Sequence, residues 1–104
     1  MIQVLAIIAT HPGKRSEVLA AFNANRAAVL AEAGCIEYGA VVDAANLPPG
    51  WATFGADTFV VVEKWESMDA LKAHAKAPHM LAYGAQTKEL VASRAIHVLE
   101  PVGG

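Results

Sequence analysis

The sequence predicts an α+β domain whose elements follow the order β-α-β-β-α-β. Two runs of β-branched and other apolar residues, at residues 2–10 and 58–66, indicate strands. Between them, the apolar residues from Lys14 to Ala33 repeat with the period of an amphipathic helix. At 104 residues the chain has the length of one domain, and we expect that single domain to span residues 1–104.

The first half of the chain is expected to form a strand, a helix and a second strand. Residues 2–10 are rich in Ile, Val and Leu and end at the turn signal His-Pro-Gly. Gly34 is the expected C-cap of the helix over residues 14–33, because glycine readily adopts the left-handed conformation that closes a helix. Strand character resumes in CIEYGAVVDA, residues 35–44. The apolar stripe of the helix contains Val18, Phe22, Val29 and Ala33.

The second half is expected to form a loop, a strand, a broken helix and a final strand. ANLPPGWATFGAD, residues 45–57, holds prolines and glycines that a strand ladder excludes. After the strand at residues 58–66, Ser67 is a favourable N-cap, and Asp69 in the first turn suits the helix dipole. Pro78 divides the helix. The remaining elements are helical segments at residues 68–75 and 79–91 and a strand at residues 93–101. Together they give the ferredoxin-like arrangement, with an antiparallel sheet.

Both faces of the predicted sheet are apolar. An antiparallel sheet with one face in water alternates apolar and polar residues, and these strands do not. Two helices from one short chain can cover only one face. We therefore expect a second copy of the sheet to cover the other, which gives an isologous homodimer. The alternating sets are Val4, Ala6 and Ile8 against Leu5, Ile7 and Ala9 in the first strand, and Val60 and Val62 against Phe59 and Val61 in the third.

The composition supports an oligomer and argues against some partners. Hydrophobic residues make up 55% of the chain and charged residues 17%, so a monomer would leave apolar patches exposed. With a net charge of −2 and no basic stripe, we expect no nucleic-acid partner. Cys35, the one cysteine, fits a reducing compartment. The opening MIQVLAIIAT lacks a basic segment and is too short to span a bilayer, which predicts a cytoplasmic protein without membrane contact.

The four histidines do not form a metal-binding motif. His74 and His79 are separated by Pro78, which breaks the helical register that a zinc pair on one helix requires. His11 and His97 lie in a turn and a strand without a nearby ligand cluster. We expect no metal. His74 shares a helix side with Ala70 and Leu71, so it is either a half-buried residue that donates to backbone, or a general base.

Glu63 and Trp65 lie on the same strand face as Phe59 and Val61. A carboxylate on an apolar face costs free energy unless it is paired or lies at the rim. One interpretation is an edge charge that meets a lysine, with Trp65 in the core. The other is a polar group in a flat aromatic pocket, where Trp65 stacks on a planar ligand. The residues alone leave both open.

The remaining candidates carry weaker signals. Tyr38 and Tyr83 are possible phenol donors to a bound oxygen, although tyrosines often cap a core. Asn23 and Arg26, on the first helix, are expected to be solvated. Cys35 lacks a histidine partner by spacing and is better explained as a small packing residue than as a nucleophile.

Three stretches of the chain resemble the antibiotic biosynthesis monooxygenase family, in particular its small quinol-monooxygenase-like members. They cover nearly the whole chain in order. The most specific block is E-x-W-x-S-x-x-A-L-x-x-H followed by x-x-x-P-H, and the Gly-Cys before the second strand adds support. The stretches are PGKRSEVLAAF, EAGCIEYG and FVVVEKWESMDALKAHAKAPH.

The resemblance implies a dimeric α/β barrel with a pocket between each sheet and its helices. It also implies oxidation of a quinol or polyphenol by O2 without a cofactor, neither metal nor flavin. The substrate anion would reduce O2, and the protein would bind the ring, assist deprotonation and exclude water. On this basis Trp65 would wall the pocket, His74 or His79 would contact a ring hydroxyl, and Glu63 would orient one of them. Phe59, Tyr38 and Tyr83 would bind the substrate.

Two departures from the family pattern leave alternatives open. Heme-degrading relatives carry an asparagine on the first strand, and QVLAIIAT has none, which disfavours that branch. The loop Asn46–Asp57 is longer than is usual and would either cover the pocket with Trp51 and Phe54 or extend the dimer contact. The main alternative function is a dimeric binding protein without catalysis, for heme or another planar aromatic ligand. An isomerase or stress-response relative is a third possibility, because one fold hosts unrelated chemistries.

Overall fold

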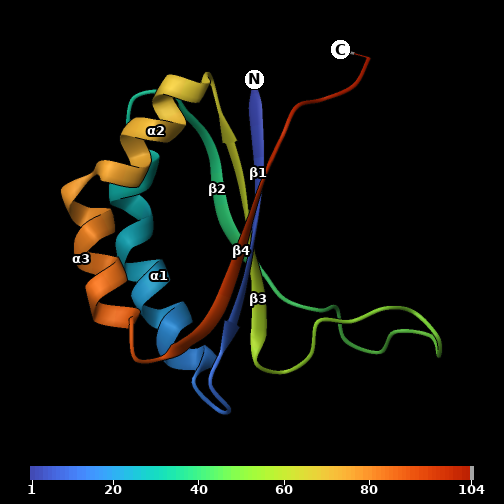
Figure 1. The fold of residues 1–104 in the computed structure, drawn as a ribbon. Coiled ribbons are helices and arrows are strands. Elements are labelled where there is room, and N and C mark those ends of the chain that lie inside the picture. Colours follow the sequence, from blue (N-terminus) through green and yellow to red (C-terminus); the bar gives the residue numbers. More distant parts are fainter. Residues whose placement is uncertain (104) are drawn as a thin grey trace.

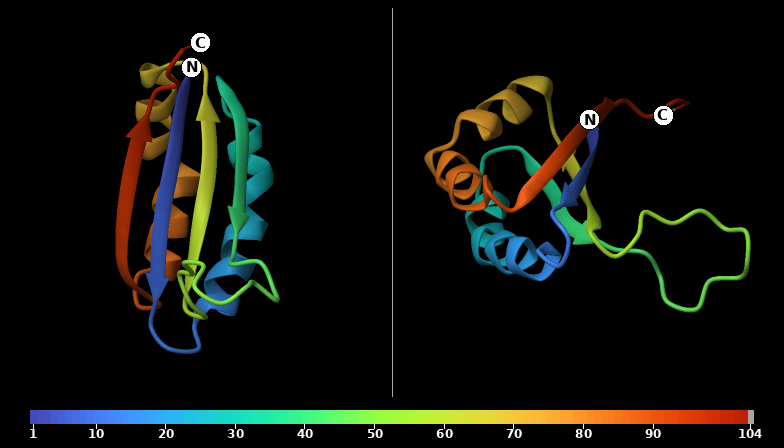
Figure 2. Two further views of the ribbon diagram at one scale, coloured as in Figure 1. Left: turned by 90° about the vertical axis from the view of Figure 1, so that its right-hand side faces the viewer. Right: turned by 60° about the horizontal axis from the view of Figure 1, so that its bottom comes forward.

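A computed structural model describes residues 1–103. The strands form one antiparallel sheet in the order β2-β3-β1-β4, and the helices cover one of its faces (Figures 1 and 2). This is the predicted ferredoxin-like α+β fold, with the second helix in two pieces. The elements are β1 (Ile2–Thr10), α1 (Arg15–Leu30), β2 (Cys35–Val41), β3 (Thr58–Trp65), α2 (Met68–Lys76), α3 (Pro78–Thr87) and β4 (Val91–Leu99).

The strand register decides which side chains face the helices. Val4 of the central strand β1 lies opposite Glu63 on β3 and Val98 on β4, and Ile8 lies opposite Phe59 and Arg94. Because successive side chains alternate between faces, these residues share the inner face, toward the helices. The prediction that Glu63 and Trp65 share a face with Phe59 and Val61 is confirmed, since all four are buried there.

Aromatic packing between α1 and the sheet forms the centre of the core. The ring of Phe22, on α1, stacks on Tyr38 with centroids 5.0 Å apart and meets Phe59 edge-on at 6.3 Å. The α1 side chains that are buried with Phe22 are Val18, Ala21 and Val29. This packing fixes β2 and β3 beneath α1.

The outer face of the sheet is apolar and exposed. No element within residues 1–103 covers it (Figures 1 and 2). Leu5, at the middle of this face, is 38% exposed, and Val41 on the edge strand β2 is 49% exposed. Ile7 and Val62 also point outward by their register.

Helix α1 ends three residues earlier than predicted. The helix over residues 14–33 was expected to close at Gly34, but α1 ends at Leu30 and the chain continues in tight turns, in which Glu32 N–H donates to Val29 O and Cys35 N–H to Glu32 O. Gly34 has a positive φ of 83°, so it adopts the left-handed conformation in the turn into β2. A Cβ on Gly34 would lie 2.6 Å from the Cβ of Ala70, so this glycine also lets α2 approach.

The start of α2 and the break after it follow the predicted signals. The Ser67 hydroxyl caps α2 by accepting a hydrogen bond from Ala70 N–H at 3.1 Å. Pro78 occupies the first turn of α3, after Ala77 in an extended conformation. The second helical piece ends at Thr87 rather than Val91, because a turn closed by Leu90 N–H and Thr87 O brings Val91 beside Thr10 as the start of β4.

The long loop between β2 and β3 projects away from the helices, on the opposite side of the sheet (Figures 1 and 2). Asp43 closes its base by accepting hydrogen bonds from Phe54 N–H at 2.9 Å and Gly55 N–H at 2.8 Å. Trp51 is 66% exposed. The loop therefore does not cover the helix side of its own sheet, which corrects the first of the two roles expected for it.

Within the described part of the chain, no helix combines the length and the apolar character needed to cross a membrane.

Candidate active site

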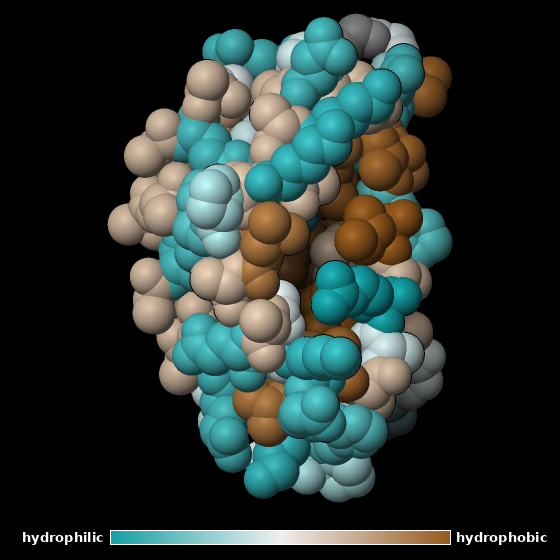
Figure 3. Space-filling view, turned by 60° about the vertical axis from the view of Figure 1, so that its left-hand side comes forward, coloured by the Kyte–Doolittle hydropathy of each residue, from teal (hydrophilic) through white to brown (hydrophobic). Residues whose placement is uncertain are grey.

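A cavity of about 430 Å³ lies between the inner face of the sheet and the helices. Most of its lining is aliphatic or aromatic, and apolar side chains surround the hollow in the space-filling view, with polar ones at its border (Figure 3). This volume is within the range of pockets that hold small molecules. The polar lining residues are Tyr38, Glu63, His74, Tyr83, Thr87 and Arg94.

Glu63, Trp65 and His74 form a compact group at one end of this cavity. The Trp65 indole N–H donates a hydrogen bond to Glu63 Oε1 at 2.9 Å. His74 Nε2 lies 4.0 Å from the same carboxylate oxygen. The imidazole of His74 packs on the indole with ring centroids 4.6 Å apart. Because β3 alternates its side chains, Glu63 and Trp65 reach the same face and meet α2 there.

Burial changes the ionisation of the cavity carboxylate and the cavity phenols. Desolvation raises the pKa of Glu63, whose exposed fraction is 7%, while the hydrogen bond from Trp65 and the positive charge that His74 can carry act in the other direction. Burial also raises the pKa of Tyr38, and the negative charges of Glu63 and Glu32 add to that rise. Tyr38 therefore stays a neutral hydrogen-bond donor at this end of the cavity.

One carboxylate oxygen joins the two histidines. Glu32 Oε2 lies 2.9 Å from His74 Nδ1 and 2.7 Å from His79 Nε2. A carboxylate only accepts hydrogen bonds, so His74 Nδ1 carries a hydrogen, and in the neutral imidazole Nε2 then keeps its lone pair. That lone pair is on the side of Glu63 and the cavity. The arrangement gives His74 the tautomer of a general base.

A family model described as antibiotic biosynthesis monooxygenase matches residues 1–86. This chain belongs to that family. It is also 38% identical over 103 residues to the probable quinol monooxygenase YgiN of Escherichia coli K12, an alignment that covers 97% of this chain and 98% of YgiN.

Solved structures agree with this monooxygenase-family fold. Rv0793 from Mycobacterium tuberculosis superposes with a TM-score of 0.80 at 30% identity, covering 99% of this chain and 96% of Rv0793. PA3566 from Pseudomonas aeruginosa superposes with a TM-score of 0.82 at 24% identity, over 98% and 94% of the two chains.

Four of the predicted site residues of this family member line the cavity. They are Glu63 and Tyr38 on the strands and His74 and Tyr83 on the helices. His79 lies on the far side of Glu32, outside the cavity lining, with 28% of its side chain exposed. Of the two histidines, His74 lines the cavity and His79 does not.

Trp65 and Phe59 lie deeper than expected. Both side chains are completely buried and neither lines the cavity. Trp65 was expected to wall the pocket, and Phe59 to bind the substrate. In this structure the indole contacts Glu63 and His74, which do line the cavity, and Phe59 packs against Phe22.

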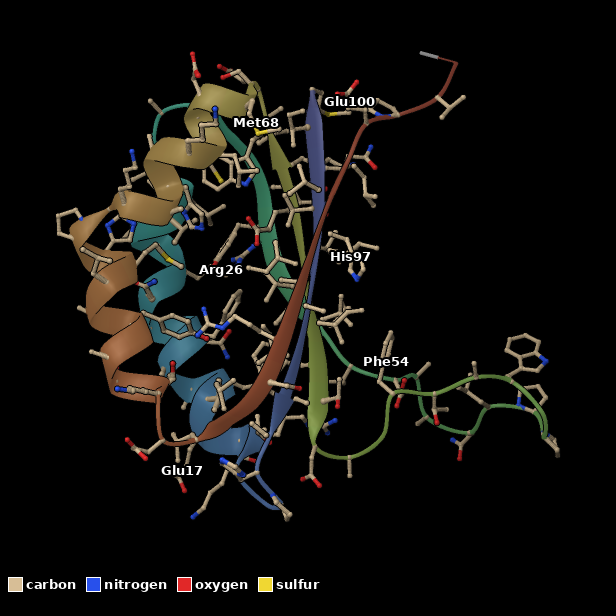
Figure 4. The ribbon with its side chains drawn as sticks, in the orientation of Figure 1. Glu17, Arg26, Phe54, Met68, His97 and Glu100 are labelled. Carbon is tan, nitrogen blue, oxygen red and sulfur yellow. The ribbon has the colours of Figure 1, made fainter. Side chains whose placement is uncertain are left out.

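Sequence reasoning missed two polar residues, Glu32 and Arg94. Glu32, rather than Glu63, is the carboxylate that orients His74, and its only sequence signal was its place in the family-like stretch EAGCIEYG. Arg94 lines the cavity from β4 and carried no signal. Arg26 is exposed, as expected, and its Nε also donates to the Tyr38 carbonyl at 2.6 Å, which joins α1 to β2 (Figure 4).

The other candidates lie outside the cavity. His97 points away from the helices (Figure 4), and His11 lies in the turn after β1. Cys35 is a free thiol at the edge of the core, and partial burial raises its pKa. Across residues 1–103, no group of three or more His, Cys, Asp and Glu side chains is placed to hold a metal ion.

Proposed function

We propose that this protein is a monooxygenase that oxidises a quinol or polyphenolic aromatic compound with O2 and needs neither metal nor flavin. The observation that supports it most is the His74 imidazole, held by Glu32 with its free Nε2 toward an apolar cavity. The name of the relative YgiN, a probable quinol monooxygenase, supports the substrate class.

In the proposed reaction, the ring of the substrate lies in the cavity and one hydroxyl points at His74. Nε2 takes the hydroxyl proton, and the imidazolium that forms is stabilised by the Glu32 carboxylate on the other ring nitrogen. Glu63, whose pKa burial raises, lies beside this position and can hydrogen-bond a ring oxygen in its protonated form.

The electrons come from the substrate itself. The deprotonated ring is electron-rich and reduces O2, one oxygen atom enters the ring, and the other leaves as water while the ring becomes a hydroxylated quinone. For a dihydroxynaphthalene this balances as quinol plus O2 giving hydroxyquinone plus H2O. The apolar lining keeps water from the reactive intermediate.

We also propose that the protein is a homodimer in which the outer faces of two sheets pack together. The exposed apolar side chains of Leu5 and Val41 support this arrangement, since they lie on the face opposite the helices. Such a pairing leaves one cavity in each protomer. The loop that carries Trp51 would then extend the contact.

The test is O2 uptake by protein stripped of metal and flavin, with a panel of hydroquinones and anthrones and a control without protein. We expect uptake that depends on the protein, with ¹⁸O from labelled O2 in the product. His74→Gln should abolish it, whereas His97→Gln, the same change on the outer face, should not. Binding of the panel compounds without uptake would instead favour a binding protein for planar aromatic ligands.

A further inference from the structure

The end of the cavity away from His74 carries a positive charge. Arg94 lies on β4 opposite Ile8 and therefore on the inner face, where it lines the cavity. None of the ion pairs among residues 1–103 involves its guanidinium. A cation at the rim of an apolar cavity, without a carboxylate of its own chain, is available to a ligand.

A second hydrogen-bond donor faces the same end. Tyr83, on α3, also lines the cavity, and the charge of Arg94 offsets part of the rise that burial causes in the pKa of the Tyr83 phenol. Both side chains line the same cavity. Thr87 does not compete for a ligand, because its hydroxyl donates to the Tyr83 carbonyl at 2.9 Å. A neutral phenol and a guanidinium both donate hydrogen bonds, which suits an anion.

The separation between the His74 end and the Arg94 end of the cavity bears on how long a ligand must be to reach both. Glu63 is level with Val4 and Val98, and Arg94 lies four residues before Val98 along β4. Four residues of strand and two strand spacings place the Cα atoms of Glu63 and Arg94 about 17 Å apart. The cavity of about 430 Å³ between these ends is large enough for a fused two-ring aromatic with a substituent at each end.

We propose that Arg94 forms a carboxylate subsite, and that the ligand class is a two-ring hydroxyaromatic acid with its hydroxyl at His74 and its carboxylate at Arg94. The hydroxyl end of this assignment rests on the proposed function. The carboxylate end does not, since it is a matter of binding alone. A guanidinium holds a carboxylate through two parallel hydrogen bonds, which fixes the orientation of the ring as well as adding affinity.

The experiment compares three stable probes by titration calorimetry at pH 7. 6-Hydroxy-2-naphthoate carries its groups at opposite ends of the ring system, 3-hydroxy-2-naphthoate carries them side by side, and 2-naphthol lacks the acid. We expect 6-hydroxy-2-naphthoate to bind at least about tenfold more tightly than 2-naphthol, as a charge-assisted pair partly screened by solvent should give. 3-Hydroxy-2-naphthoate should gain less, because its two groups cannot reach both ends.

Variants at Arg94 decide whether the preference comes from this residue. Arg94→Gln should remove the preference for the acid and leave 2-naphthol within about twofold of wild type, and Arg94→Lys should keep part of it. Lys88→Gln removes a positive charge at the end of α3, outside the cavity lining, and should change nothing. Arg94 is exposed on an edge strand, so the variant should fold, which circular dichroism checks.

Three results would overturn the proposal: equal affinity for the acid and 2-naphthol, an acid preference that survives in Arg94→Gln, or no binding of any probe. Its failure is distinguishable from failure of the proposed function. An acid preference that depends on Arg94, without O2 uptake on the quinol panel, would leave the subsite standing and reject the oxidation. O2 uptake on the quinol panel without a preference for the acid would support the oxidation and reject the carboxylate subsite.

Discussion

Replacement of Glu32 with glutamine tests whether this carboxylate sets the tautomer and orientation of His74. Glu32 Oε2 accepts hydrogen bonds from His74 Nδ1 at 2.9 Å and His79 Nε2 at 2.7 Å, and only 13% of its side chain is exposed. Glutamine keeps the shape but removes the negative charge. It can also present an N–H where an acceptor is needed, which would oppose the tautomer that frees Nε2.

The size of the effect follows from the charge that His74 acquires in the reaction. When Nε2 takes the substrate proton, the bond from Nδ1 to Glu32 joins two charged groups, and a bond of that kind contributes about 1.5–3 kcal/mol. Loss of that stabilisation in the transition state lowers kcat/KM by about 10- to 150-fold. A step of this size is well above the error of an O2-uptake assay.

The assay is the initial rate of O2 uptake over a range of quinol concentrations, beside urea unfolding of the same variant. Glu17→Gln is the matched control. It makes the same substitution at an exposed glutamate, whose carboxylate lies 3.5 Å from Lys14 Nζ. It should stay within about twofold of wild type. If Glu32→Gln also stays within about twofold while His74→Gln loses activity, Glu32 does not orient His74 for the reaction.

Three further predictions concern stability and assembly. Gly34→Ala should destabilise the fold by about 1–3 kcal/mol in urea unfolding, because the φ of 83° at this position strains a residue that carries a Cβ. The control Gly84→Ala, within α3, should stabilise the fold by about 0.5–1 kcal/mol. An unchanged stability of Gly34→Ala would mean that the turn relaxes without cost. The folded pKa of Glu63 is raised, so the contribution of this residue to the free energy of unfolding is fully present below the ordinary pKa of about 4.5 and is lost as pH rises through the folded value. Glu63→Gln should therefore gain stability relative to wild type from about pH 4.5 upward, and a difference independent of pH would contradict the assigned burial. Leu5→Asp should convert the proposed dimer to monomer in sedimentation at micromolar concentration. Ala28→Asp, which introduces the same carboxylate on the exposed side of α1, should remain dimeric, and a dimeric Leu5→Asp would exclude this face.

Local signals predicted the elements whose physics is local. Ser67 caps α2 through a hydrogen bond to a residue three positions away, and Pro78 breaks the helix by its own geometry. The alternation of β3 likewise assigned Glu63 and Trp65 to the correct face. Periodicity gives the face of a residue but not its depth, which explains why Trp65 and Phe59 were expected in the cavity wall and lie behind it.

Contacts between distant segments could not be read from the sequence. Glu32 meets His74 across 42 positions and His79 across 47. Arg94 reaches the cavity only because β4 pairs with the central strand β1 in a particular register. The close approach of Ala70 to Gly34 likewise joins segments far apart in the sequence.

The break between α2 and α3 separates the helix that carries His74 from the helix that forms one wall of the cavity. Lining residues on α3, such as Met80 and Leu81, lie after the break, while the sheet beneath carries Glu63 and Arg94. A change in the length or angle of the segment around Ala77 would move this wall and leave the sheet chemistry in place. Substitutions, insertions or deletions in this short segment could therefore widen or narrow the cavity, while the residues on the sheet stay in place.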